Sequence, residues 1–156
     1  MIIPIKNEDG EMVDVEAISL IMRKEFAEQI VAGTKTFEIR IASPFYDRIF
    51  LDPVGNNKWR KTDYPWGDVP WREDVPFVVH FHNYNNSWSL DVEVEEFHFV
   101  VPIPEEEEEI HSWGCHEFDE ILDEYKNLTP EQAKNTNINF FYAIKLGAIL
   151  NSTNLS

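Results

Sequence analysis

The 156-residue sequence has few of the features that mark secreted or membrane proteins. Its single cysteine, Cys115, excludes an intramolecular disulfide framework. It has no apolar run long enough to cross a membrane, and residues 1–5 lack the basic start and cleavage site of a signal peptide. These absences predict a cytoplasmic protein without a membrane segment.

Basic residues are also scarce. The sequence has 13 Lys and Arg residues and 29 Asp and Glu residues, which gives a formal net charge of −16. Affinity for nucleic acid comes largely from neutralisation of phosphates by Lys and Arg, so non-specific binding to long nucleic acid is not expected. The charge is uneven along the chain. Residues 23–72 hold 9 basic and 7 acidic residues, whereas residues 73–156 hold 3 and 17. A local basic cleft on an acidic body is compatible with this distribution.

Apolar residues are plentiful by comparison. The chain is 43% hydrophobic and 13% aromatic, and its length suits one domain with a real core. We therefore predict a single domain over residues 1–156. A turn signal at residues 7–10 predicts an N-terminal hairpin extension over residues 1–16, and residues 151–156 read as a polar C-terminal tail.

The most informative stretch is residues 33–40, Gly-Thr-Lys-Thr-Phe-Glu-Ile-Arg. It follows a short amphipathic helix pattern, and Gly33 falls where a left-handed helix end favours glycine. Phe37 then begins an alternation of apolar and polar residues that predicts a strand. The polar side of this strand carries Thr36, Glu38 and Arg40, which on spacing alone is a solvated face with a weak ion pair.

The pattern Gly-x-Lys-x-x-Glu-x-Arg after a short helix resembles the signature of the ASCH domain, a member of the PUA-like superfamily. Residues 19–26 resemble the strand and helix start that lead into this signature, and residues 140–147 resemble the closing strand of the family. The resemblance frames roughly residues 17–150. It implies a mixed α and β fold, mostly β: a small PUA-like barrel flanked by two main helices.

Other segments have clear local signals. Residues 44–76 contain five prolines and two glycines and predict an irregular segment, whereas residues 77–84 and 90–99 predict a long hairpin with one apolar and one polar face. The acidic run 105–109 predicts a solvated loop. Residues 117–126 predict a second amphipathic helix, Thr129 predicts the start of a short helical turn, and residues 140–150 predict the last strand.

We expect a ligand cleft between the Gly33 turn, the following strand and the 77–99 hairpin. PUA-like folds are commonly RNA-binding modules, so the resemblance implies RNA or a nucleotide-like small molecule as the ligand. Aromatic residues interleaved with cations in residues 58–72 suit base stacking and phosphate binding, although the tryptophans could equally cover the core. The candidate ligand-binding residues are Arg23, Lys35, Thr36, Glu38, Arg40, Trp59, Arg60, His82 and Tyr84.

Two further functions stay open. The first is hydrolysis of RNA or a modified nucleoside, with Lys35 and Glu38 as catalytic acid–base partners. Some relatives resemble a 4-acetylcytidine amidohydrolase that places a threonine three residues after the lysine, where this chain has Glu38. This departure argues against that specific reaction, and the sequence does not decide whether the protein is an enzyme. The second is a protein-interaction module that uses the acidic C-terminal half.

Histidine and cysteine suggest metal ligands in two places. His80 and His82 share one strand face, and His111, Cys115 and His116 lie close in sequence. Neither spacing matches a standard zinc motif, and ordinary histidines are several times commoner. His82 could instead line the ligand cleft. The sequence therefore predicts no metal site and no cofactor, and it says nothing of oligomeric state.

Overall fold

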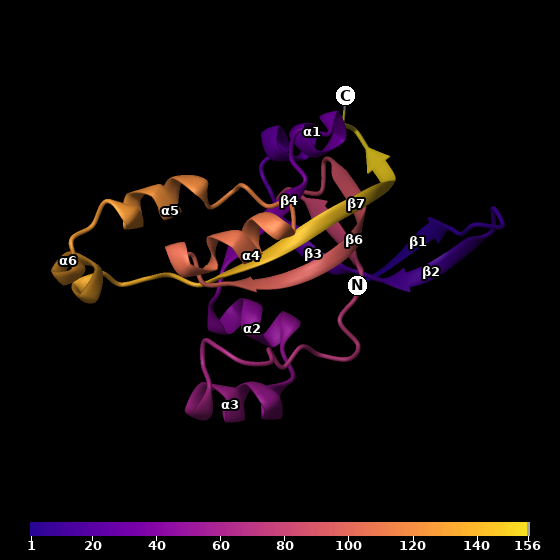
Figure 1. Cartoon of the computed structure of the whole chain (residues 1–156). Coiled ribbons are helices and arrows are strands. Elements are labelled where there is room, and N and C mark those ends of the chain that lie inside the picture. Colours follow the sequence, from indigo (N-terminus) through magenta and orange to yellow (C-terminus); the bar gives the residue numbers. More distant parts are fainter. Residues whose placement is uncertain (156) are drawn as a thin grey trace. The chain divides into compact units, whose positions relative to one another are not determined.

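The computed structural model describes residues 1–155 and has a mixed α and β fold (Figure 1). In chain order its elements are β1 (Ile2–Lys6), β2 (Met12–Glu16), β3 (Ile18–Ile21), α1 (Lys24–Ala32), β4 (Phe37–Ile41), α2 (Pro44–Phe50), α3 (Pro53–Thr62), β5 (Val78–His82), β6 (Ser89–Val100), the 3-10 helix η1 (Pro104–Glu106), α4 (Glu107–Ser112), α5 (Asp119–Lys126), α6 (Pro130–Asn135) and β7 (Phe141–Thr153). The α+β class predicted from the sequence is confirmed.

The strands form two sheets. β1 and β2 pair antiparallel around the predicted turn, which confirms a hairpin over residues 1–16. The other five strands are ordered β3-β5-β6-β7-β4. In this sheet β5 and β6 form the predicted antiparallel hairpin, and β3 pairs parallel with β5.

The described residues divide into two compact units. Unit 1 is Met1–Glu38, Asp74–Phe97 and Ile144–Ser156, of which Ser156 lies outside the described residues. Unit 2 is Ile39–Glu73 and His98–Ala143. The closing strand β7 continues to Thr153, so residues 151–153 of the predicted polar tail are strand.

Unit 1 buries β5 more completely than the sequence predicts. Val79 and Phe81 are fully buried, as an apolar face requires, but His80 on the other face is also only 9% exposed. Its partner on β6 is Asp91, which is 5% exposed. The polar face of the hairpin is therefore buried at this pair, where His80 and Asp91 meet.

Helix α1 ends as predicted. Gly33 has φ of 81° and its backbone N–H donates to the carbonyls of Gln29 and Ile30, which satisfies the last turn of the helix. Ala27 and Ile30 form the buried stripe of α1, whereas Phe26 is 39% exposed. The glycine thus turns the chain from α1 toward β4.

Replacement of Gly33 by alanine should lower the free energy of unfolding by about 1 kcal/mol, since an L-residue is strained at positive φ. An added Cβ would meet nothing within 4 Å, so backbone strain is the whole cost. Urea denaturation measures the change. Gly33→Asn is the matched control and should lose less, because asparagine tolerates the left-handed region better. Equal losses in the two variants would contradict this explanation.

Unit 2 corrects the prediction for residues 44–76. Two helices stand where the sequence indicated an irregular segment, and Pro44 and Pro53 begin them rather than break them. Ser43 caps α2 by accepting the Tyr46 N–H, and Asp52 caps α3 by accepting the Gly55 N–H. The cation-rich stretch of residues 58–61 is therefore helical.

The acidic run is likewise not a loop, since residues 104–112 form η1 and α4. Acidic side chains favour the first turn of a helix, where the macrodipole is positive. The predicted helix over residues 117–126 is confirmed as α5, with Phe118 and Leu122 buried. Thr129 caps α6 in a full capping box with Gln132. With α2, α3, α4 and α6, the described residues contain six α-helices rather than two main ones.

Candidate functional site

The residues predicted to bind a ligand divide between the two units. Unit 1 contains Arg23, Lys35, Thr36, Glu38, His82 and Tyr84. Unit 2 contains Arg40, Trp59 and Arg60.

In unit 1, parallel pairing brings Arg23 beside the β5–β6 turn. Ile21 pairs with His82, and the Met22 N–H then donates to the His82 carbonyl at 2.9 Å. Because parallel strands end at the same edge of a sheet, the residues that follow β3 and β5 emerge together. Arg23 and Tyr84 consequently line one cleft of about 650 Å³.

The cleft combines cations, aromatics and amides. Its lining residues are Ile21, Met22, Arg23, Lys24, Asn83, Tyr84, Ser87, Trp88 and Asn154. These nine described residues include two cations and no carboxylate, in a chain with a net charge of −16. The Arg23 side chain is 79% exposed, and its contact with Glu25 is an exposed pair at 3.5 Å, which contributes little.

Hydrogen bonds hold the β5–β6 turn in shape. The Asn83 side chain accepts the Ser87 N–H at 2.9 Å and donates to the Ser87 hydroxyl at 2.6 Å. Asn154 donates to the Ser87 carbonyl at 3.0 Å. Tyr84 projects from this turn with 89% of its surface exposed, so its ring is available to a ligand.

The other predicted residues of unit 1 lie outside the lining of this cleft. His82 donates from Nδ1 to the Asn83 carbonyl at 2.8 Å, so in its neutral form Nε2 accepts from the Ser19 hydroxyl, also at 2.8 Å. Lys35 has its ammonium 5.5 Å from the centre of the Phe26 ring. Glu38 is 7% exposed rather than part of a solvated face, and Thr36 is exposed.

In unit 2, Arg60 belongs to a buried polar network. Its guanidinium donates to Asp47 at 2.6 Å and stacks over the Tyr64 ring at 3.9 Å. Asp47 is 6% exposed and also accepts from the Tyr142 hydroxyl at 2.5 Å. Burial and the nearby Asp47 carboxylate both raise the pKa of Tyr142, so this phenol stays protonated.

Trp59 and Arg40 contact protein groups in unit 2. The indole of Trp59 is 4% exposed and donates to the Trp66 carbonyl at 2.6 Å, which favours the core-covering role over base stacking. Arg40 donates to the Tyr46 hydroxyl at 2.8 Å. Arg60 lines a smaller cleft of about 390 Å³ together with Asp47. The guanidinium of Arg60 is already paired with the Asp47 carboxylate in this cleft.

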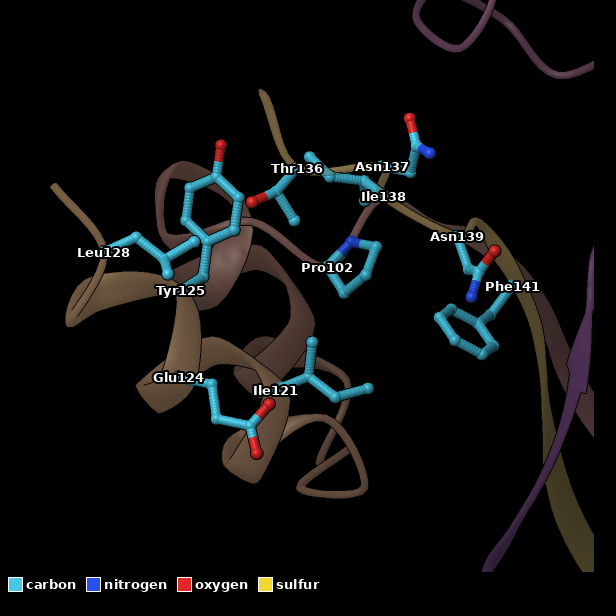
Figure 2. Close-up of a pocket in the computed structure, with 10 residues that line it drawn as sticks. All are labelled: Pro102, Ile121, Glu124, Tyr125, Leu128, Thr136, Asn137, Ile138, Asn139 and Phe141. Carbon is cyan, nitrogen blue, oxygen red and sulfur yellow. The ribbon is translucent and has the colours of Figure 1, made fainter. Parts of the chain in front are cut away.

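A third pocket, of about 340 Å³, lies in unit 2 (Figure 2). Figure 2 shows Ile121 and Tyr125 of α5 together with Pro102 and Phe141 around it. Glu124 is the one charged residue among the described residues that line it. A phosphate would therefore meet no cation here. Apolar side chains beside a carboxylate are what the protein-interaction alternative expects, and that alternative stays a prediction.

Sequence reasoning missed several residues at these places. Lys24, Asn83 and Trp88 line the unit 1 cleft, and the Asn-Asn-Ser turn signal next to Tyr84 was the available clue. The cleft also lies at the start of α1 rather than at its Gly33 end. A cleft at Gly33 stays a prediction, as do the roles of Lys35 and Glu38.

The comparisons with known proteins give one family. The family model of the ASCH domain matches residues 20–147. No curated protein and no solved structure matches the chain. None of the helices in residues 1–155 has the length and hydrophobicity that a membrane span requires.

Proposed function

Because the chain belongs to the ASCH domain family, which is PUA-like and generally proposed to bind RNA, we propose that it binds RNA or a nucleotide-like ligand in the unit 1 cleft. The observation that carries this proposal is the lining of that cleft, which includes Arg23, Lys24 and the exposed Tyr84 and no acidic residue. The Glu25 carboxylate that pairs with Arg23 is outside this lining. The Gly33–Arg40 signature supports the family rather than the position of the ligand.

The two cations suit a phosphate. Arg23 offers a planar fork of donors and Lys24 a mobile point charge at the start of α1. Arg23 is the N-cap of this nine-residue helix, and its side chain makes no capping bond. The positive end of the helix dipole thus adds to the two side-chain charges.

The aromatic and amide groups suit a base. Tyr84 provides an open ring face, and base–aromatic stacking contributes about 1–3 kcal/mol per base in single-stranded complexes. Asn83 and Ser87 can exchange part of their mutual hydrogen bonding for the edge of a base. The cleft volume of about 650 Å³ suits a nucleotide or a short stretch of RNA.

The net charge of −16 limits the length of RNA that binds well. With two phosphate-neutralising cations, the affinity should fall with salt at a logarithmic slope of about −1.4. Arg23→Ala should reduce this slope by about 0.7, because one cation is lost. Fluorescence anisotropy with a labelled hexanucleotide RNA over a salt series measures both slopes. Lys134→Ala, an exposed cation of α6, is the control and should leave the slope unchanged.

Tyr84→Ala should weaken binding of the same RNA by about 1–3 kcal/mol, which is about 5- to 150-fold in Kd, because the stacking ring is lost. Phe45→Ala removes another exposed aromatic ring and should leave Kd unchanged. Isothermal titration with the RNA and with mononucleotides measures these values. Failure of the wild-type protein to bind any of them at low salt would overturn the proposal. So would Tyr84→Ala and Arg23→Ala variants that bind the RNA as tightly as the wild type. Appearance of a cleaved RNA product during the titration would instead favour the hydrolase alternative.

A further inference from the structure

Unit 2 contains a cluster of metal-ligand side chains that the RNA-binding proposal does not use. His111 lies in the last turn of α4, His116 lies in the following loop, and Asp119 begins α5. One ligand atom from each lies within 4.8 Å of the others. The sequence alone suggested His111, Cys115 and His116, but it missed Asp119 and predicted no metal site.

The carboxylate of Asp119 lies between the two imidazoles. His111 Nε2 is 2.6 Å from Oδ1, and His116 Nδ1 is 3.2 Å from Oδ2. The imidazole rings are tilted against each other with centroids 4.6 Å apart. The hydrogen bond from His111 is the main cause that lowers the pKa of Asp119, so the carboxylate is ionised at neutral pH.

Buried anchors hold the backbone of this cluster. Each candidate ligand directly follows a side chain that is at most 1% exposed, namely Ile110, Cys115 and Phe118. Gly114 has φ of 82° and reverses the chain after α4, where its N–H donates to the His111 carbonyl. The ligand backbone is thus fixed by packing, whereas the ligand side chains remain accessible to a solute.

We propose that His111, His116 and Asp119 bind a zinc ion, with water in the fourth position. Two imidazoles and one carboxylate are a ligand set that Zn²⁺ accepts, at bond lengths of about 2.0–2.2 Å. Tetrahedral zinc sets its ligand atoms about 3.3 Å apart. The His116–Asp119 distance of 3.2 Å is close to that spacing, whereas the His111–Asp119 distance of 2.6 Å is a hydrogen-bond distance that lengthens when the ion binds. Small rotations of the two exposed rings are sufficient, and the ion replaces the protons that the rings donate toward Asp119.

The surroundings also favour a cation. Residues 105–109 are five consecutive glutamates, and they extend over η1 and the start of α4, the helix that carries His111. Their charge raises the local concentration of any divalent ion. It does not select zinc, because carboxylates alone favour harder cations. The selection comes from the two imidazoles.

Cys115 is not part of the proposed ligand set. Its thiol is fully buried, and burial raises its pKa, so a thiolate is disfavoured at neutral pH. The three proposed ligands are 32%, 64% and 45% exposed in their side chains, in chain order. An ion can therefore reach them without unfolding of the loop.

The experiment is isothermal titration of ZnCl₂ into the tag-free, chelator-treated full chain. The expected result is one zinc per chain, with Kd at least tenfold weaker in His116→Ala and in Asp119→Asn. Glu120→Gln is the matched control, since it removes the same charge at the next residue, and it should bind zinc like the wild type. Visible absorption of a Co²⁺-loaded sample provides a second readout of tetrahedral nitrogen and oxygen ligation.

Three outcomes would overturn the proposal: no stoichiometric zinc binding, unchanged affinity in both ligand variants, or an equal loss in Glu120→Gln. Tighter binding of copper or nickel at the same residues, without zinc binding, would overturn the assignment of the metal. Circular dichroism of each variant excludes unfolding as the cause of a loss. These outcomes do not depend on whether the protein binds RNA.

Discussion

Asp47→Ala is expected to lower the free energy of unfolding by about 3 kcal/mol, which is a large share of the stability of a single domain. The carboxylate of Asp47 accepts from both Arg60 and Tyr142, and the Tyr142 side chain is only 1% exposed. Its removal leaves the phenol hydroxyl buried without its acceptor and the guanidinium without its counter-charge. Arg60 limits the loss because its side chain is 37% exposed and can turn toward water.

Chemical denaturation in urea measures this loss, and near-ultraviolet circular dichroism reports on the aromatic packing around Tyr142. Tyr142→Phe removes one hydrogen bond and should cost about 1 kcal/mol. Asp68→Ala, an exposed aspartate in the same unit, is the control and should stay within about 0.5 kcal/mol of the wild type. An Asp47 variant as stable as the Asp68 variant would show that the network contributes nothing.

Asp91→Ala should destabilise unit 1 by a similar amount, about 3 kcal/mol. Oδ1 of Asp91 bonds His80 Nδ1 at 2.5 Å, and Oδ2 accepts from the Asn151 amide at 2.9 Å. The side chains of His80 and Asp91 are 11% and 7% exposed. The buried His80 donor loses its acceptor, which by itself costs about 1–3 kcal/mol. The half-buried Asn151 amide loses one hydrogen bond but keeps its other one, to the Pro4 carbonyl.

The control for Asp91 is Glu93→Ala, since Glu93 lies two residues further along β6 and is exposed. It should change stability by less than about 0.5 kcal/mol. Hydrogen exchange of the β5 and β6 amides would localise the effect to this pair of strands. If Asp91→Ala and Glu93→Ala were equally stable, the hydrogen bond between His80 and Asp91 would contribute nothing to the free energy of unfolding, which would contradict the prediction.

Signals that act over a few residues were sufficient to predict several elements. Gly33 marked the end of α1, and Thr129 with Gln132 marked the capped start of α6. The spacing of Phe118 and Leu122 identified α5. In each case the physical cause is a backbone conformation, a cap or an apolar stripe that lies within one turn of the helix. The resemblance to the ASCH domain also came from the residue pattern, and the match over residues 20–147 confirms the family.

Predictions from local sequence were wrong where one residue type is common both in loops and at the start of helices. Pro44 and Pro53 suggested breaks in residues 44–76, but a proline at the first helical position is favourable, and Ser43 and Asp52 provide the caps. The acidic run at residues 105–109 suggested a loop, although acidic residues also stabilise the first turn of a helix. In both segments the sequence was compatible with a loop and with a helix start, and we chose the loop because of the composition.

The sequence by itself determined the mixed α and β class and most element positions, because caps, turns and side-chain periodicity depend on near neighbours in the chain. The family followed from the residue pattern. Tertiary structure alone decided which polar side chains are buried and which meet. Tyr142 reaches Asp47 across 95 residues, and Arg23 joins Tyr84 in one cleft only because β3 pairs parallel with β5. A side-chain alternation specifies two faces of a strand, but burial depends on what the rest of the chain places against each face.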